Sequence, residues 1–181
     1  MIWSRIRATL FAFGAWSLLF FCLIPQHPAF AVDSPAARKT LFGLKGVYII
    51  AENLQPNIQK FANKFDLTTD KVLQKIAFRL RENGIKVFNK EEWLAATGRP
   101  VLYLNINSHE REKYWFAYDI RLELQQVASL ETTPSIKALV ATWSVNMTGI
   151  TNVGSLNVLH DNVQSLVDIF IRAYLSENRN H

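Results

Sequence analysis

The sequence has few of the residues that form disulfides or hold metals. It contains one cysteine, Cys22, and four histidines among 181 residues. Cys22 lies in an N-terminal segment that we expect to be removed, so the mature chain has no thiol for a disulfide or for thiolate chemistry. Apart from terminal His181, the mature histidines are His109 and His160, and no pair of them has the spacing of metal ligands on one helix. We therefore predict that the protein holds no metal and no cofactor.

The longest apolar run, residues 10–24, lies near the N-terminus and is short for a membrane span. It follows Arg5 and Arg7 and precedes the small-residue motif Ala29-Phe30-Ala31, an order typical of a signal peptide. We predict that residues 1–31 are a signal peptide and that residues 32–181 form a single α+β domain without a stable membrane span. The alternative is that the run is retained as a membrane anchor.

Cys22 does not indicate a lipid-attached cysteine. The residue before it, Phe21, is bulky where a lipid-attachment motif needs a small residue, and Cys22 lies inside the apolar run. The sequence therefore indicates a cleaved signal peptide without lipid attachment. We expect the chain to be exported to the periplasm or another extracytoplasmic compartment.

Neither sign of charge dominates the sequence. The whole chain has 20 Lys and Arg against 15 Asp and Glu, and the predicted signal peptide removes two arginines and no acid. The mature chain keeps a net charge of +3, spread along its length. This mild excess gives no case for a nucleic-acid partner, which export also disfavours.

The stretch from Tyr114 to Glu131 organises the rest of the chain. Its residues alternate between apolar and polar, a period of two that is typical of a strand with one buried face. The apolar set is Phe116, Tyr118, Ile120, Leu122, Leu124, Ala128 and Leu130, and the other set is Trp115, Asp119, Arg121, Glu123, Gln125 and Ser129. We predict one long strand that presents the first set to the core.

The other elements follow from similar patterns. We predict strands at Lys45–Asn53, Ile85–Phe88, Pro100–Asn107 and Ile136–Thr148, with short helices after Pro56 and from Trp93 to Thr97. The main helices are predicted from Thr68, as N-cap, to Gly84, and from Asn157 to Ser176. Loops are predicted at His109–Lys113 and Gly149–Leu156. In the last strand, Leu139, Ala141, Trp143, Val145 and Met147 are expected to share the apolar face.

These elements predict an α+β fold. We expect a two-layer sandwich in which a mostly antiparallel sheet of four to five strands carries two main helices on one face. The first strand, the helix after it and the strand at Ile85–Phe88 indicate a parallel pair with a right-handed crossover. The last three strands indicate an antiparallel meander.

Several short strings carry a resemblance to a known family. They are Leu44-x-Gly46-Val47, Leu80-Arg-x-x-Gly84-Ile85-x-Val87, Leu102-Tyr103-x-Asn105-x-Asn107, Tyr118-x-Ile120-x-Leu122-Glu123-Leu124-x-Gln126-x-x-x-Leu130, Ala141-Thr142-Trp143-Ser144 and Leu166-Val167-Asp168-x-Phe170-Ile171-x-x-Tyr174-Leu175. Together they resemble a family of small exported bacterial proteins of unknown function, over nearly all of the mature chain. The element order is also similar to that of the small outer-membrane lipoprotein that plugs the lipopolysaccharide translocon, which is an analogy of fold alone. The resemblance implies export and fold but no chemistry.

The sequence gives little support for catalysis. Gly149 to Ser155 lies where a phosphate-binding loop would be, but Ser155 and Leu156 replace the Lys and Ser/Thr of that motif, so we expect a plain flexible connection. Asp119 and Glu123 share a strand face with Arg121, which is typical of a solvated surface with compensating charges. We therefore predict no catalytic residue and no enzyme.

The outer face of the sheet is the remaining candidate for a binding site. Its residues are Tyr103, Asn105, Asn107, Trp115, Asp119, Arg121 and Glu123, together with Thr142 and Ser144. Aromatic and Arg side chains are enriched in protein interfaces. Our first hypothesis is a non-enzymatic envelope binding or assembly factor that holds a protein partner. The alternatives are a carrier of a small apolar ligand between helices and sheet, and a hydrolase.

Overall fold

The computed structural model describes residues 33–179, so the predicted signal peptide lies outside the described residues. Over this range the fold is α+β, with a four-stranded mixed sheet in the order β1-β2-β3-β4. The strands are β1 (Tyr48–Ala51), β2 (Val101–Glu112), β3 (Trp115–Leu130) and β4 (Thr133–Asn152). β1 pairs parallel with β2, while β2 with β3 and β3 with β4 pair antiparallel.

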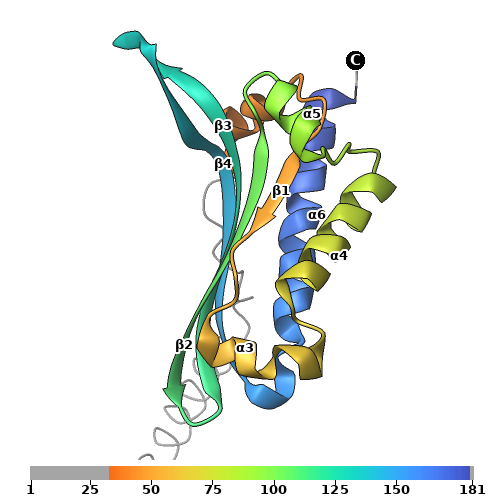
Figure 1. Ribbon diagram of the computed structural model, residues 1–181, viewed down its shortest axis with the longest axis vertical. Helices are drawn as coiled ribbons and strands as arrows, with labels where there is room; N and C mark the ends of the chain where they lie inside the picture. The colour runs from red at the N-terminus through yellow and green to blue at the C-terminus, as the bar shows by residue number, and fades with distance from the viewer. Residues whose placement is uncertain (1–32, 180–181) are drawn as a thin grey trace, which may run out of the picture.

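Five α-helices accompany the sheet in the described part of the chain. They are α2 (Pro35–Arg38), α3 (Pro56–Ala62), α4 (Thr69–Glu82), α5 (Lys90–Ala95) and α6 (Val158–Asn178). Figure 1 shows α4 and α6 side by side on one face of the sheet, with α3 and α5 at opposite ends of the domain. No helix within residues 33–179 has the length and apolar character needed to cross a membrane.

Helix α4 forms as its sequence predicts. Thr68 is the N-cap, and its hydroxyl accepts a hydrogen bond from the backbone N–H of Lys71 at 3.3 Å. Val72, Ile76 and Leu80 form the buried stripe. Gly84 follows the helix in the left-handed conformation, with φ +75°, which a glycine adopts without steric cost. The predicted limits and the buried face of this helix are therefore confirmed.

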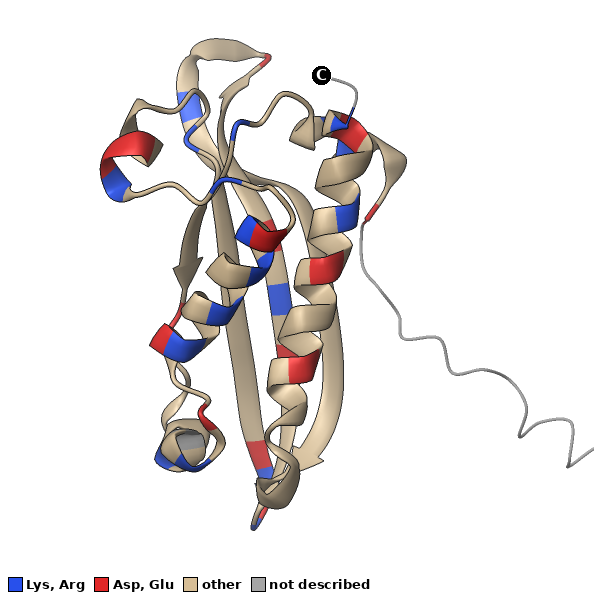
Figure 2. Ribbon diagram, turned by 90° about the vertical axis from the view of Figure 1, so that its right-hand side faces the viewer, with Lys and Arg blue, Asp and Glu red and all other residues tan. Residues whose placement is uncertain are grey.

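Charged side chains join the two main helices on their exposed side. Basic residues are frequent along α4 and acidic residues along α6 (Figure 2). Arg79 of α4 donates two hydrogen bonds to the carboxylate of Asp168 of α6, at 2.9 and 3.2 Å. Because both side chains are partly exposed, this pair orients the helices but contributes little to the free energy of unfolding.

The core lies between these helices and the sheet. Ile120 and Leu122 of β3 are fully buried, as predicted, and so is Phe170 of α6. Phe170 meets the ring of Trp143 edge-on, with 5.3 Å between ring centroids. Aromatic contacts of this kind add to the free energy gained from burial alone. The prediction that the apolar face of β3 meets the helices is confirmed up to Leu124.

The sheet differs from the prediction in its pairing. It is mixed, because the extended connection after α5 returns the chain alongside β1 in the same direction, giving the parallel β1–β2 pair. The predicted fifth strand at Ile85–Phe88 is reduced to one parallel bridge between Val47 and Val87. The sheet of the described residues therefore has four strands, and only two of its three pairings are antiparallel.

A β-bulge breaks the predicted apolar pattern of β3 and β4. Leu124 pairs with Trp143 but Gln125 pairs with Ala141, so Thr142 is an extra residue in β4. Because side chains alternate with a period of two, the extra residue moves Leu139 and Ala141 to the opposite face from Trp143. Leu130 and Leu139 are 46% and 52% exposed, so the prediction that they face the core is wrong.

Beyond the bulge, β3 and β4 continue as a projecting hairpin. We call its residues, 126–139, the arm. Figure 1 shows the arm extending past the rest of the domain at the end where α5 lies. The two helices that cover the sheet do not reach its tip. Apolar residues of the arm therefore remain exposed although they alternate as a buried strand would.

Two predicted loops are strand in the structure. His109 to Glu112 belong to β2, and Gly149 to Asn152 belong to β4, followed by a single 3₁₀ turn at Val153–Ser155. Both β2 and β4 continue because they remain paired with β3 as far as Trp115. The expected flexible connection at Gly149–Leu156 is thus wrong over its first half.

Hydrogen bonds of Asp33 hold the first described residues against the core. They give a prediction about how stability depends on pH. Its carboxylate accepts hydrogen bonds from Arg38 Nε at 2.7 Å and from Trp143 Nε1 at 2.9 Å. The Arg38 guanidinium, and next the indole of Trp143, hold the pKa of Asp33 below its ordinary value of 3.8 against the opposing effect of burial. A carboxyl pKa lowered by folding stabilises the protein above the ordinary value and loses this effect as pH falls through the lowered value.

We therefore expect Asp33→Asn to lower the free energy of unfolding by about 1.5 kcal/mol at neutral pH, the value of a charged hydrogen bond. The difference from the parent should shrink below the ordinary carboxyl pKa. Urea unfolding at neutral and acidic pH measures both values. Asp70→Asn, which removes the same charge from the exposed first turn of α4, is the matched control and should change stability by less than about 0.5 kcal/mol. An equal loss at both pH values would contradict this account.

Candidate functional site

The structure places the seven predicted site residues on one face of the sheet, opposite α4 and α6. We call this the outer face. The register aligns its side chains in rows across the strands: Tyr103 with Glu123 and Ser144, Asn105 with Arg121 and Asn146, and Asn107 with Asp119 and Thr148. Trp115 lies further along β3, next to Asn152 of β4. The period of two along β2 and β3 therefore brings these residues together.

A hydrogen-bond network built on Glu52 occupies the β1–β2 side of the outer face. Glu52 follows β1, and its two carboxylate oxygens accept hydrogen bonds from the Tyr103 hydroxyl and from the Asn105 amide. Asn107 donates to Asn105 in turn and accepts from Gln55 at 3.2 Å. Each side chain is thus held in a fixed orientation before any partner arrives.

This network also affects the protonation of the Tyr103 phenol. The Glu52 carboxylate, together with partial burial, raises the pKa of the Tyr103 phenol above its ordinary value of 10.0. A phenol with its ordinary pKa is already protonated at neutral pH, and the upward shift holds Tyr103 further in the form that donates a hydrogen bond to Glu52. A nucleophilic or basic tyrosine would need the opposite shift.

Charged side chains occupy the centre of the outer face. Arg121 lies 3.6 Å from Glu123, which also accepts a hydrogen bond from Gln125 at 3.1 Å. Asp119 accepts a hydrogen bond from Asn146 at 3.4 Å. With Glu52, the face carries three carboxylates against the single guanidinium of Arg121, so its centre is net acidic.

An apolar cluster adjoins this polar centre at the β2–β3 turn. Trp115 is 48% exposed and Ile150 is 65% exposed, and both line a hollow of about 230 Å³ beside Ala117. We call Trp115 and Ile150 the apolar anchor. Ile150 was missed by sequence reasoning because it lies in the stretch predicted to be a loop. The signal that could have found it is the alternation of Ser144, Asn146, Thr148 and Ile150 on one strand face.

Helix α5 covers the opposite end of the outer face. Tyr48 of β1 stacks on Trp93 of α5 with 5.1 Å between ring centroids, and Val101 beneath them is buried. Thr142, which we expected on this face, lies at the bulge and bonds to Gln126 at 2.9 Å. The uncovered part of the face therefore runs from the row of Tyr103 to Trp115.

The space between the helices and the sheet is filled by side chains. Ile76 and Leu80 of α4, Leu122 of β3 and Leu166 of α6 are all fully buried in one continuous core. A carrier of a small apolar ligand needs a cavity in this space. No observation on these core residues favours that alternative.

The histidines differ in their surroundings. His109 is exposed, whereas His160 is buried, and its Nε2 lies 2.9 Å from the backbone carbonyl oxygen of Asp66. This geometry makes His160 a structural tie between α6 and the turn before α4. Across residues 33–179, no three His, Cys, Asp or Glu side chains come together as a metal site would require.

Comparisons of the chain with protein-family models, with curated proteins and with solved structures found no match. The resemblance to a family of small exported bacterial proteins, and the analogy to the translocon lipoprotein, therefore stay predictions.

Proposed function

We propose that this protein is a non-enzymatic accessory factor of the bacterial cell envelope that holds a protein partner on the outer face of its sheet. One observation carries the proposal: an exposed apolar anchor, Trp115 with Ile150, adjoins an ordered polar network on an uncovered face. The proposed layout is one helical layer behind the sheet, with the other face left free over most of its length. Its place outside the cytoplasm follows from the predicted signal peptide.

The composition of the outer face fits the anatomy of a protein interface. Trp, Tyr and Arg are the residue types that most often dominate binding energy, and the face offers Trp115, Tyr103 and Arg121. Side chains that are already hydrogen-bonded lose little conformational freedom on binding. The network around Glu52 therefore lowers the entropic cost of ordering this surface against a partner.

The charges of the face indicate the chemistry of the partner. Three carboxylates and one guanidinium favour a partner surface that brings hydrogen-bond donors or basic side chains to the centre. The anchor requires an apolar pocket or patch at the β2–β3 turn. We infer a folded protein with a basic, donor-rich surface beside an apolar hollow.

Site-directed photo-crosslinking tests this proposal in the native host. A photoreactive phenylalanine analogue at position 115 or 150 should give a specific adduct with another envelope protein, because both positions lie in the proposed contact. Phe78, which is 63% exposed on α4, is the matched control on the helical face and should give no adduct. Adducts of equal yield from positions 78 and 115, or none from positions 115 and 150, would contradict the proposal.

Substitutions on the face should weaken binding of the crosslinked partner. We expect Trp115→Ala and Arg121→Glu each to raise the dissociation constant at least about tenfold, since removing a hot spot costs about 2 kcal/mol or more. Isothermal titration with the purified partner measures the change. Phe78→Ala should leave affinity unaltered, and all three variants should keep the parent's circular dichroism. Parent-like affinity of both face variants would exclude the outer face as the binding site.

A further inference from the structure

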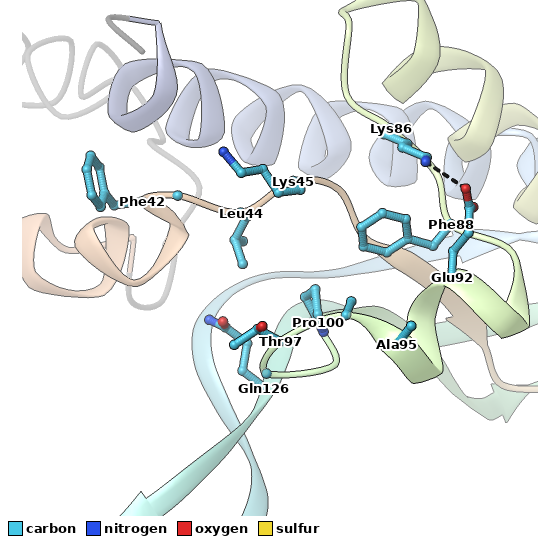
Figure 3. Close-up of a pocket in the computed structure, with 13 residues that line it drawn as sticks. Phe42, Leu44, Lys45, Lys86, Phe88, Glu92, Ala95, Thr97, Pro100 and Gln126 are labelled. Carbon is cyan, nitrogen blue, oxygen red and sulfur yellow. Dashed lines mark ion pairs between the residues drawn. The ribbon is translucent and has the colours of Figure 1, made fainter.

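Two adjoining hollows lie at the end of the domain from which the arm projects. The larger, of about 600 Å³, is lined by Phe42, Leu44, Lys45 and Phe88 among others (Figure 3). The second, of about 460 Å³, lies between the loop after α5 and the arm. Ala96 and Gly98 line both hollows, so the two hollows lie on opposite sides of one loop. The backbone carbonyl of Gly98 accepts a hydrogen bond from Val127 of the arm at 2.7 Å, which fixes this loop to the arm.

Exposed apolar side chains gather at this end. Ten large hydrophobic residues of the described chain are exposed, and five of them lie on α5, the arm and the segment before β1. They are Phe42, Leu94, Leu130, Ile136 and Leu139. Their exposed fractions range from 46% to 57%. Figure 1 shows α5 and the arm at the same end of the molecule. We call this surface the arm end.

Basic side chains surround the apolar residues of the arm end. Lys45 lines the larger hollow, and Arg99 and Lys137 line the smaller one. None of these three forms an ion pair with another residue of the described range 33–179. Glu92 is the one acid of the described residues that lines either hollow, and its carboxylate is paired with Lys86 at 2.6 Å. With Glu131 at the turn of the arm as the opposing acid, Lys45, Arg99 and Lys137 leave a net positive charge beside the exposed apolar groups.

Under the alternative in which the predicted signal peptide is retained as a membrane anchor, the sequence before the described residues also points to a lipid surface. The apolar run at residues 10–24 is joined to Asp33 by eight residues, which span at most about 30 Å when extended. Asp33 is bonded to Trp143, next to the bulge at the base of the arm. Where the run is retained in a bilayer, this linker keeps Asp33 and the base of the arm within about 30 Å of that bilayer.

We propose that the arm end docks on a bilayer surface that contains anionic lipids. Leu139, on the same face of the arm as Lys137, and Ile136, on the opposite face, enter the headgroup region when the hairpin inserts end-on, while Lys45, Arg99 and Lys137 contact lipid phosphates. Mixed apolar and basic surfaces bind such bilayers by apolar burial and by electrostatic attraction together. The apolar anchor at Trp115 lies about 40 Å away along β3, at a rise of about 3.3 Å per residue, so docking leaves the outer face free.

Fluorescence at single labelled positions tests the docking in the full chain. After Cys22→Ser, one cysteine is introduced as I136C or L139C and labelled with an environment-sensitive fluorophore. Exposed positions away from the arm end, as F78C and I150C, are the matched controls. With vesicles of phosphatidylcholine and phosphatidylglycerol we expect a blue shift, and quenching by nitroxide lipids, at positions 136 and 139 only. This pattern does not depend on whether the apolar run inserts.

Charge reversal tests the electrostatic part. Lys45→Glu with Arg99→Glu and Lys137→Glu should raise the lipid concentration for half-maximal signal at position 136 at least about tenfold, because each basic residue near an anionic surface strengthens binding about fivefold. The same number of reversals on the helical side, Lys64→Glu with Lys71→Glu and Arg81→Glu, should change it less than about threefold. Circular dichroism checks that both variants remain folded.

Four outcomes would overturn the proposal. They are an equal signal at all four positions, an equal response to vesicles of phosphatidylcholine alone, a lipid-independent crosslink between copies through position 136, and saturation of the signal by monomeric decyl phosphate. The third result would identify a second copy of the chain as the occupant, and the fourth a small amphiphilic anion.

Discussion

Trp143→Ala should lower the free energy of unfolding by about 4 kcal/mol, within the range known for removal of a buried tryptophan. Trp143 is 1% exposed and packs edge-on against Phe170, so truncation leaves a large cavity between β4 and α6. It also removes the indole donor that binds the Asp33 carboxylate at 2.9 Å. Loss of the donor adds to the cost because it leaves a partly buried charge with one partner fewer.

Urea and thermal unfolding measure this effect. For a domain of this size we expect the midpoint of thermal unfolding to fall by about 10–15 °C. Trp115→Ala is the matched control, because it removes the same side chain from the exposed outer face and should change stability by less than about 1 kcal/mol. Similar losses in the two variants would mean that the face carrying Trp143 does not form the core.

Substitution of the two tryptophans also distinguishes an effect on stability from an effect on the proposed partner binding. Trp143→Ala should reduce partner binding only through the fraction of unfolded protein, whereas Trp115→Ala should reduce it in a folded protein. This distinction follows from the alternation of side chains along the sheet, which sends one tryptophan to each face. In a sheet covered by helices on one side, the covered face stabilises the fold and the other face can contact a partner. A substitution on one face can therefore leave the role of the other face unchanged.

The elements that the sequence predicted well are those determined by local chemistry. Helix α4 has its cap, its stripe and its terminal glycine within residues 68–84, and β3 shows its alternation without interruption as far as Leu124. Asn89 and Glu92 form a capping box at the start of α5, which is a local signal of the same kind. Each of these signals depends on neighbours in the chain, so no knowledge of tertiary contacts was needed.

The predictions that are wrong concern features determined by contacts between residues far apart in the sequence. The bulge at Thr142 has no signal of its own, because a polar residue between Ala141 and Trp143 also fits an unbroken strand. The extensions of β2 and β4 depend on pairing with the start of β3, which charged residues near His109 did not suggest. The fifth strand failed because only Val87 meets Val47, and the chain then leaves the sheet for α5.

The same contrast applies to the candidate site. Strand parity alone predicted that Tyr103, Asn105, Arg121 and Glu123 share a face, and the register confirms this placement. Parity could not show that Glu52, at the end of a different strand, binds two of these side chains. It also could not reveal the arm end, whose exposed leucines follow the pattern of a buried strand.

Gly46→Ala should strongly destabilise the described domain. A Cβ at this position would lie 2.5 Å from the backbone carbonyl oxygen of Lys86 and 2.9 Å from a ring carbon of Phe88. That carbonyl accepts the hydrogen bond of Val47 N–H at 3.0 Å, so moving it disrupts the parallel bridge beside β1. We expect a loss of about 3 kcal/mol, from overpacking together with an unfavourable φ of +157°.

Gly84→Ala is the matched control, because Gly84 also has a positive φ but a Cβ there would meet nothing within 4 Å. It should cost about 1–2 kcal/mol, the price of the left-handed conformation alone. The difference between the two variants in urea unfolding therefore isolates the close approach of the two chain segments. Equal losses would show that backbone conformation, and not the packing of residues 45–47 against 86–88, explains the need for glycine. A larger loss at Gly46 would place this contact among those that hold β1, and with it Glu52 and the polar network, in register on the outer face.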